Sequence, residues 1–398
     1  MSKTRVSIVK TMLKPEYPEI RRAVEKALDL IGGIQDLVKP GSLVLIKPSW
    51  VSFPVEREAA CITLPEVTRA IAEITKGLGG APVIAESSAI GVDTEKVIRA
   101  SGYEDLRNMG YEVVNLEKTK SIRLPVPHGR AFKSMPCWEI VQRADVIISV
   151  PKLKTHDQTE ITCAIKNLKG LQPDKGKKND HRKGLFDAVP DLLAVVKPQL
   201  AVVDAILCQE GVGPMFGRPV EMDLILAGRD LVAVDSTCGR LIGYDPREVR
   251  ITVNSAERGL GIMDPAQIVI VGQPLDSVKR RFMRSYEDEQ VKVEGFQLIY
   301  GEITCTGCRN TILSSLLDMK NADQLCYLPG VTVVAGDAPL PEGIPRESIV
   351  TIGNCMRKNA RTRRHVRGCP PNCADVVKGI IGDRAESKSR YATDYTAL

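Results

Sequence analysis

The sequence predicts an α/β fold, in which a mostly parallel, doubly wound sheet is followed by a smaller C-terminal α/β domain that is rich in cysteine and binds a metal. Two observations predict the sheet. Strand-like and helix-like segments alternate through residues 5–271, and several strands are continuous apolar runs such as residues 146–150, VIISV. Such alternation is typical of parallel sheets with helices on both faces. The metal-binding domain is predicted from the clustered cysteines near the C-terminus.

The individual elements follow from the spacing of apolar residues. We expect strands at residues 5–10, 42–46, 82–85, 112–116, 146–150, 200–206, 224–227, 268–271 and 348–352. We expect helices at residues 18–31, 63–78, 94–109, 185–196, 231–242, 249–258, 310–319 and 374–381. Thr63 is placed to cap its helix, with Glu66 three residues later. The charged segment 277–290 marks the boundary between a domain of residues 1–285 and a cysteine-rich domain of residues 286–398.

Composition narrows the class of protein. The chain has 398 residues, of which 43% are hydrophobic but only 4% aromatic, so its core must be aliphatic. The net charge of +6 favours anionic ligands or an acidic partner. The N-terminus lacks a signal-peptide core, and no window approaches the ~20 apolar residues of a membrane helix. We therefore expect a cytoplasmic protein without a membrane partner, whose reduced cysteines bind metal rather than form disulfides.

Nucleotide-binding motifs are missing from the predicted strand ends. There is no GxGxxG after the first strand and no GxxxxGK[ST] in the chain. A Rossmann dinucleotide site and a P-loop are therefore not expected. The scarcity of aromatic side chains that stack on bases also weighs against a nucleic-acid partner.

A basic segment begins where the apolar strand at residues 146–150 ends. Ligands of parallel α/β sheets bind at the carboxyl ends of strands, and cations there suit a small carboxylate or phosphate substrate. The residues predicted to be catalytic are Lys152, Lys154, His156, His181 and Glu210. Those predicted to bind substrate are Lys47, Ser87, Lys166, Asn167 and Lys169. Residues 173–184 are expected to form a mobile loop that closes over the anion. The alternative is a solvated basic loop with incidental histidines.

Five cysteines lie on predicted turns or helix starts, where backbone N–H groups stabilise thiolates. Cys305, Cys308, Cys355 and Cys369 are the predicted ligands, with Cys373 in reserve for the last place. Zinc usually binds two paired knuckles. The irregular spacing here favours a [4Fe–4S] cluster, with Zn²⁺ as the alternative. Cations at 357, 358, 361, 363, 364 and 367 would stabilise the cluster or dock an acidic partner.

Several motifs resemble the bacterial and archaeal family known as domain of unknown function 362. They are the turn IKPSWV at Lys47, TLPEVTRAI from Thr63, PKLKTH at residues 151–156 and KNLKG at residues 166–170. His181, EGVGP at residues 210–214 and LVAVD at residues 231–235 add to the resemblance. It covers about residues 1–265 and supports the architecture more than the chemistry. The resemblance implies association with iron–sulfur modules, although the C-terminal part is not a ferredoxin-type CxxCxxCxxxCP run.

Three functions are compatible with these features. The first is an iron–sulfur enzyme, a redox or Lewis-acid catalyst acting on a small anionic substrate. The second is a non-enzymatic electron-transfer or maturation partner that docks on a larger complex through the arginine-rich segment. An acidic electron carrier such as ferredoxin is a further possible partner of the same cations. The third is a zinc-binding protein that uses the same arginines for nucleic acid. The sequence leaves the substrate, the reaction and the formation of homo-oligomers open.

Overall fold

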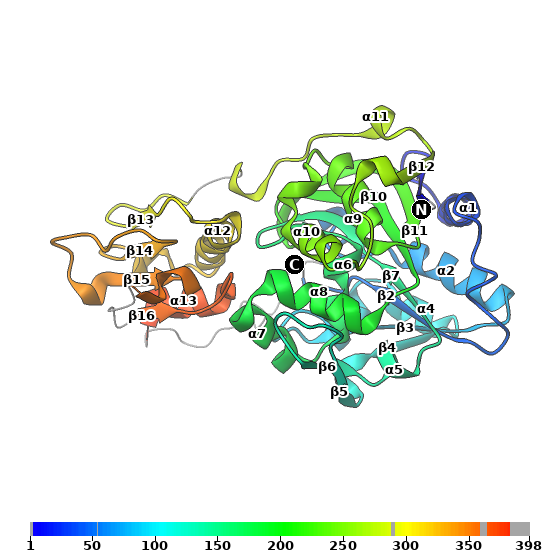
Figure 1. Cartoon of the computed structure of the whole chain (residues 1–398), viewed down its shortest axis with the longest axis horizontal. Coiled ribbons are helices and arrows are strands. Elements are labelled where there is room, and N and C mark those ends of the chain that lie inside the picture. The colour runs from blue at the N-terminus through cyan, green and yellow to red at the C-terminus, as the bar shows by residue number, and fades with distance from the viewer. Residues whose placement is uncertain (1–2, 54, 288–290, 359–363, 383–398) are drawn as a thin grey trace.

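The computed structural model describes residues 3–53, 55–287, 291–358 and 364–382 (Figure 1). It confirms an α/β fold, in which the two larger sheets belong to different parts of the chain. A ten-stranded sheet forms the larger part of the molecule, and a four-stranded sheet belongs to the smaller C-terminal part. Among the described residues, no helix combines the length and the apolar character needed to cross a membrane.

The large sheet is mostly parallel. Its strand order is β12 (Ile268–Gly272), β1 (Thr4–Lys10), β11 (Phe216–Gly228), β10 (Leu200–Val212), β7 (Val146–Val150), β2 (Leu43–Pro48), β3 (Ala81–Glu86) and β4 (Glu112–Asn115). Off this path, β8 (Lys152–His156) pairs in parallel with β10 and antiparallel with β9 (Glu160–Thr162). Strand β11 is antiparallel to both of its neighbours. The long β10–β11 hairpin, which was not expected, makes the sheet mixed.

Helices cover both faces of this sheet, which confirms the doubly wound prediction. On β2, Leu45 belongs to one hydrophobic core, whereas its neighbours Val44 and Ile46 belong to the other. Period-two alternation along a strand sends adjacent side chains to opposite faces. One core is covered by α1 (Tyr17–Leu30), α2 (Pro65–Gly77), α3 (Thr94–Ala100) and α4 (Tyr103–Asn108). The other is covered by α6 (Ala164–Asn167), α8 (Leu185–Val196), α9 (Leu231–Leu241) and α10 (Arg250–Glu257).

Two local predictions on this part are wrong. The helix expected at residues 94–109 is broken, because Gly102 adopts φ +82 and separates α3 from α4. Thr63 does not cap α2; its hydroxyl accepts a hydrogen bond from Ser49 N and donates one to Val150 O. The helix instead begins after Leu64, whose N–H donates to the buried carboxylate of Asp204 at 2.7 Å.

The basic segment after residue 173 is also not the loop that we expected. It forms α7 (Asp174–Lys183), with Asp174 in the first turn and three basic residues in the last turn. This charge order complements the helix macrodipole. Lys177, Asp180 and His181 are buried along one face. The hairpin of β5 (Ser121–Pro125) and β6 (Ser134–Trp138) and the short helices α5 (Ile140–Arg143) and α11 (Leu275–Val278) complete this part of the chain.

The C-terminal part has a parallel sheet and a core of its own. The sheet order is β13 (Gln297–Tyr300), β14 (Thr332–Ala335), β15 (Ile349–Ile352) and β16 (Arg364–Val366). Helices α12 (Thr306–Asn321) and α13 (Cys373–Ile381) pack on it through a core that includes Ile312, Val333, Val350 and Val376. This is the predicted smaller α/β unit. The division at residues 285/286 stays a prediction.

Candidate functional site

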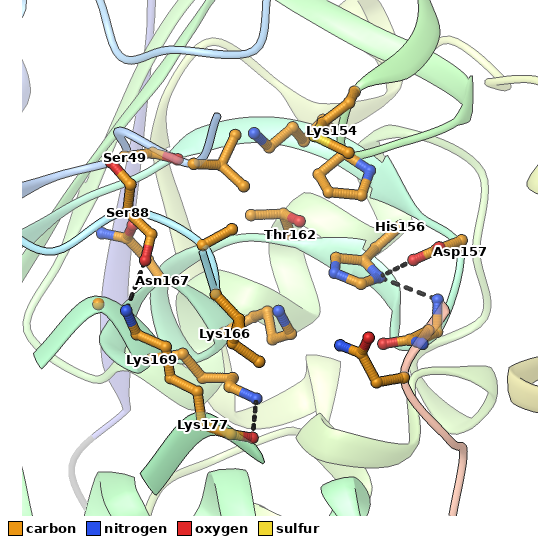
Figure 2. A pocket seen from close by; sticks show the side chains of 18 of the residues that line it. Ser49, Ser88, Lys154, His156, Asp157, Thr162, Lys166, Asn167, Lys169 and Lys177 are labelled. Atoms are coloured by element: carbon orange, nitrogen blue, oxygen red, sulfur yellow. Dashed lines mark hydrogen bonds and ion pairs between the residues drawn. The ribbon is translucent and has the colours of Figure 1, made fainter. Parts of the chain in front are cut away.

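A cavity of about 150 Å³ lies beyond the carboxyl ends of β2 and β3 and beside β8 (Figure 2). Its wall is formed by chain that follows β2 and β3, by the β8–β9 hairpin, by α6 and α7, and by two residues of the C-terminal part, Asn372 and Cys373. Its charged and titratable lining groups are Glu86, Lys154, His156, Asp157, Lys166, Lys169, Lys177, His181 and Cys373. Four lysines against two carboxylates make this an environment for an anion.

His156 points into the cavity from the end of β8 (Figure 2). Its Nδ1 lies 2.8 Å from Asp157 Oδ1 and 2.9 Å from the backbone N of Gln158, so the protein holds this nitrogen and fixes the ring. The Nε2 edge faces the cavity. Burial, helped by the positive charge of Lys166, lowers the pKa of His156 to about 4. The imidazole is therefore neutral near pH 7.

The lysines differ in how they are held. Lys154 Nζ donates to Cys61 O at 2.6 Å, and Lys177 Nζ donates to Ser87 Oγ at 3.1 Å. Lys169 Nζ lies 3.3 Å from His181 Nε2 and 3.5 Å from Asp180 Oδ2. The ammonium group of Lys166 makes neither a hydrogen bond nor an ion pair with any residue that the structure describes, although its backbone O accepts from Leu168 N.

The charged forms of these lysines are disfavoured by their surroundings. Burial, reinforced by the charge of Lys169, lowers the pKa of Lys166 to about 7. Burial likewise lowers the pKa of Lys154 to about 8. A bound anion would stabilise the ammonium forms, because an opposite charge at close range favours ionisation.

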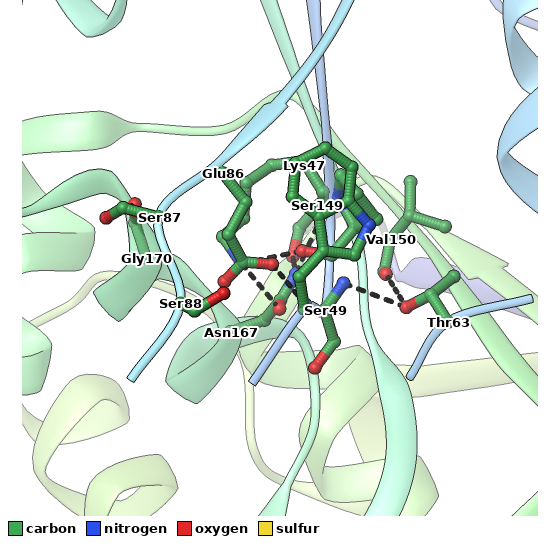
Figure 3. A network of polar contacts seen from close by, with 12 residues as sticks. Lys47, Ser49, Thr63, Glu86, Ser87, Ser88, Ser149, Val150, Asn167 and Gly170 are labelled. Atoms are coloured by element: carbon green, nitrogen blue, oxygen red, sulfur yellow. Dashed lines mark hydrogen bonds and ion pairs between the residues drawn. The ribbon is translucent and has the colours of Figure 1, made fainter. Parts of the chain in front are cut away.

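A buried network beneath the cavity positions these groups (Figure 3). Lys47 is fully buried and donates to Glu86 Oε1 at 2.6 Å, Asn167 Oδ1 at 2.8 Å and Pro48 O at 2.7 Å. Asn167 Nδ2 donates in turn to Lys47 O and to Ser149 Oγ. The strand ends of β2, β3 and β7 and the end of α6 are thereby joined.

The short helix α6, which carries Lys166 and Asn167, is held from below by a buried acid. The backbone N–H groups of Ala164 and Ile165 donate to the carboxylate of Asp235 on α9, at 2.7 and 3.3 Å. Burial raises the pKa of Asp235 to about 7. This contact sets the position of α6 relative to the cavity.

The structure gathers seven of the ten predicted catalytic and substrate-binding residues around the cavity: Lys154, His156, His181, Ser87, Lys166, Asn167 and Lys169. Three lie elsewhere. Lys47 is held in the network below, and Lys152 forms a buried ion pair with Asp204 at 2.6 Å. Glu210, near the end of β10, accepts a hydrogen bond from Met283 N in the segment that follows α11. These three residues do not line the cavity, because partners from other segments, Glu86, Asp204 and Met283, hold them outside it.

No catalytic or substrate-binding role was predicted for three of the charged residues that line the cavity, Asp157, Lys177 and Glu86. Asp157 follows the KLKTH motif directly, so its place at a strand end was a usable signal. Lys177 sits among several lysines of segment 173–184, and no local feature distinguishes it until the helix places it on the buried face.

Four of the five predicted metal ligands influence one another. The Cys308 thiol donates to Cys305, and this contact lowers the pKa of Cys305 to about 5 and raises that of Cys308. The charges of Cys369 and Cys355 further raise the pKa of Cys308. Among the described residues, however, no three His, Cys, Asp or Glu side chains gather closely enough to hold a single metal ion.

A glycine and a pair of hydrogen bonds shape the backbone around these thiols. A Cβ on Gly353, which has φ +92, would lie 3.1 Å from Cys308 Sγ. Asn354 N donates to Gly368 O at 2.9 Å, and Gly368 N donates to Asn354 Oδ1 at 3.1 Å. The loops that carry Cys355 and Cys369 are thus tied together.

Cys373, by contrast, faces the cavity. Its Sγ lies 3.6 Å from Asp157 Oδ2, at the start of α13. The neighbouring Gln158 Nε2 donates to Pro371 O at 2.9 Å and to Thr311 Oγ1 at 3.0 Å, and so joins the β8–β9 hairpin to the C-terminal part. Cys373 therefore lines the cavity, and its role as a metal ligand stays a prediction.

Comparison with known proteins agrees with these motifs. The family "Domain of unknown function (DUF362)" matches residues 44–240. The thylakoid-associated protein sll1697 of Synechocystis sp. is 30% identical over 301 residues, which cover 68% of this chain and 89% of that protein. The chain belongs to the DUF362 family.

One solved structure is also similar to this DUF362 protein, but more distantly. The lactate racemase apoprotein of Thermoanaerobacterium thermosaccharolyticum superposes with a TM-score of 0.39 at 12% identity, over 84% of this chain and 69% of the other. We draw nothing on function from so weak a similarity. The cavity and the thiols of the DUF362 chain have to be interpreted from their own chemistry.

Proposed function

We propose that this protein is an iron–sulfur redox enzyme that binds a small carboxylate or phosphate in the lysine-lined cavity. The observation that carries the proposal is the position of Cys369. Its backbone N donates to His181 O at 3.1 Å, and its backbone O accepts from Leu185 N at 2.8 Å. The loop that bears a thiol of the four-cysteine set is therefore fastened directly to the helix that lines the cavity.

The positive charge of the cavity supports anion binding, because few carboxylates inside the cavity neutralise its lysines. Its carboxylate Glu86 already binds Lys47, and Asp157 lies against His156. Lys166 and Lys154, with depressed pKa values, become fully charged when an anion arrives. Buried cations that lack a full set of partners are costly, and a ligand that completes the set is bound correspondingly well.

His156 supports a proton-transfer role at the same place. The ring is fixed through Nδ1, is neutral at pH 7 and turns Nε2 towards the bound anion. A positioned, neutral imidazole is an effective general acid or base. His156 would move a proton to or from the substrate, while Lys166 and Lys169 neutralise its negative charge.

The thiols support a cluster better than a single zinc ion. Zinc holds four sulfurs at about 2.3 Å, which requires the thiols to lie close together. The looser grouping of Cys305, Cys308, Cys355 and Cys369 suits four ligands that each bind a different iron. A cluster held in this way by Cys305, Cys308, Cys355 and Cys369 would supply one-electron transfer rather than Lewis-acid catalysis.

Anaerobic purification followed by iron, sulfide and zinc analysis tests the cluster. We expect iron and sulfide in equal amounts, little zinc, and visible absorbance that dithionite bleaches. A double variant, Cys305→Ser with Cys355→Ser, should lose this absorbance, whereas Cys326→Ser, at an exposed cysteine, should keep it. One equivalent of zinc without iron would overturn the proposal in favour of a zinc protein.

Calorimetric titration with sulfate, as a probe for phosphate, and with acetate, as a probe for carboxylate, tests the cavity. We expect binding that Lys166→Met weakens by at least tenfold, since a charge-assisted contact is worth about 1.5–3 kcal/mol. The matched control is Lys178→Met, which removes an exposed lysine from the same basic region outside the cavity lining. Equal affinities in wild type and Lys166→Met would refute the assignment.

A further inference from the structure

A second concave surface lies between the end of α7 and the C-terminal sheet. It is a groove of about 860 Å³, formed by the last residues of α7, the loop after β15, strand β16 and α13. It is separate from the cavity, with which it shares no lining residue. The cations that line it are Arg182, Lys183, Arg357, Arg364, Arg367 and Lys378.

The positive charge of this groove is poorly neutralised. Asp375 is the one acid among the lining residues that the structure describes. Arg182, Lys183, Arg357, Arg367 and Lys378 are exposed, and none of the five makes an ion pair with another described residue. The positive charge also acts on His365, which lines the groove. Burial, together with the charges of Arg367 and Arg357, lowers the pKa of its imidazole. An exposed field of one sign attracts a partner of the opposite sign.

The groove adjoins the loops that bear two of the thiols. Asn354, which precedes Cys355, lines it, and so does Arg367, two residues before Cys369. The hydrogen bonds between Asn354 and Gly368 hold both loops against this wall. On the other side, Arg182 and Lys183 follow His181 of the cavity directly. A partner seated here would lie next to the thiols, on the surface away from the substrate.

We propose that this groove is the docking surface for a small acidic electron-carrier protein, which exchanges one electron with the cluster. The inference rests on the proposed function, since it assigns the entry point for the electrons of that enzyme. No bond forms or breaks: the carrier is oxidised by one electron as the cluster is reduced by one. Complementary charge would set the orientation and the rate of encounter.

Two other polyanions would meet the same charge but fit the surroundings less well. A groove has concave walls, whereas a membrane surface is flat and would contact chiefly the rim. Within the described residues 3–53, 55–287, 291–358 and 364–382, the lining includes no Phe, Tyr or Trp on which bases could stack, which disfavours single-stranded nucleic acid. Neither alternative accounts for the position of the groove beside Cys355 and Cys369.

Binding of a plant-type ferredoxin to the full chain, measured by interferometry at low and at physiological salt, tests docking independently of the cluster. We expect the association rate to fall at least tenfold when Arg182→Glu and Lys183→Glu are combined, and to fall in the same way with salt. The matched control combines Arg22→Glu with Lys26→Glu on α1, at the opposite end of the molecule (Figure 1). The control should bind as wild type does.

The second measurement is the rate at which reduced ferredoxin bleaches the iron–sulfur absorbance. The groove variant should slow this rate, while reduction by dithionite stays unchanged. Docking without iron would leave the groove assignment standing and refute the proposed function. Equal ferredoxin binding by groove and control variants would overturn the inference. So would groove-dependent binding of phosphatidylglycerol vesicles or of a DNA duplex in place of ferredoxin.

Discussion

Anion binding at the cavity should weaken steeply as the pH rises, and Lys166 is the residue that makes it do so. In the free protein this lysine has a pKa of about 7, because it is buried and lies near Lys169. An anion placed beside it favours the ammonium form and raises that pKa. Binding above neutral pH is therefore coupled to the uptake of a proton, and the affinity must fall as that proton becomes scarce.

The size of the effect follows from the fraction of Lys166 that is charged before binding. That fraction is about nine-tenths at about pH 6 and about one-hundredth at about pH 9, so the association constant should fall about 90-fold over this interval. Lys154, with a pKa of about 8, adds to the slope at the upper end. Sulfate is the suitable probe, because its own charge is constant over this range.

Isothermal titration calorimetry with sulfate, in buffers of different ionisation enthalpy, measures both the affinity and the protons taken up. We expect close to one proton per sulfate near pH 8. In Lys166→Met the slope that begins near pH 7 should disappear and the weaker contribution of Lys154 should remain. Lys178→Met should behave as wild type. A wild-type affinity that is independent of pH, or proton uptake in Lys166→Met as large as in wild type near pH 7, would refute the reasoning.

Three further predictions concern stability and the thiols. Lys47→Met should lower the free energy of unfolding by about 3–5 kcal/mol, because it leaves the buried carboxylate of Glu86 unpaired; urea denaturation measures this, and the exposed Lys39→Met should change it by less than about 0.5 kcal/mol. Gly353→Ala should reduce the iron bound on reconstitution, because its Cβ would approach Cys308 Sγ to 3.1 Å at φ +92. Gly343→Ala is the control for backbone strain, because Gly343 has φ +76 but open space around it. Equal amounts of bound iron in the two variants would contradict a role for Gly353 in making room for the Cys308 thiol. His156, whose pKa falls from 6.5 to about 4 on folding, should make stability decline as the pH drops through that window. The loss amounts to about 3 kcal/mol, and a His156→Asn variant with the same pH profile of unfolding as wild type would show that the imidazole does not titrate in this way.

The sequence by itself determined the elements whose signal is local. Apolar runs and helical spacing located β7, α8 and α9 within a residue or two, and the alternation of strands and helices identified a sheet covered on both faces. Cations after a buried strand indicated an anion site, because strand ends of a parallel sheet share one edge. The CxxC motif and the later turn cysteines likewise marked one region of the chain.

Only the tertiary structure decided which of those side chains meet. Lys152 and Lys154 have the same local pattern, yet Lys152 is paired with Asp204 while Lys154 lines the cavity, since their neighbours come from distant strands. The helix α7 owes its buried face to the cavity wall that it covers, and Cys373 lies there because Gln158 ties the two parts of the chain together. Contacts between residues far apart in sequence leave no periodic trace in the chain, so their partners are fixed by the packing of the sheet and not by local spacing.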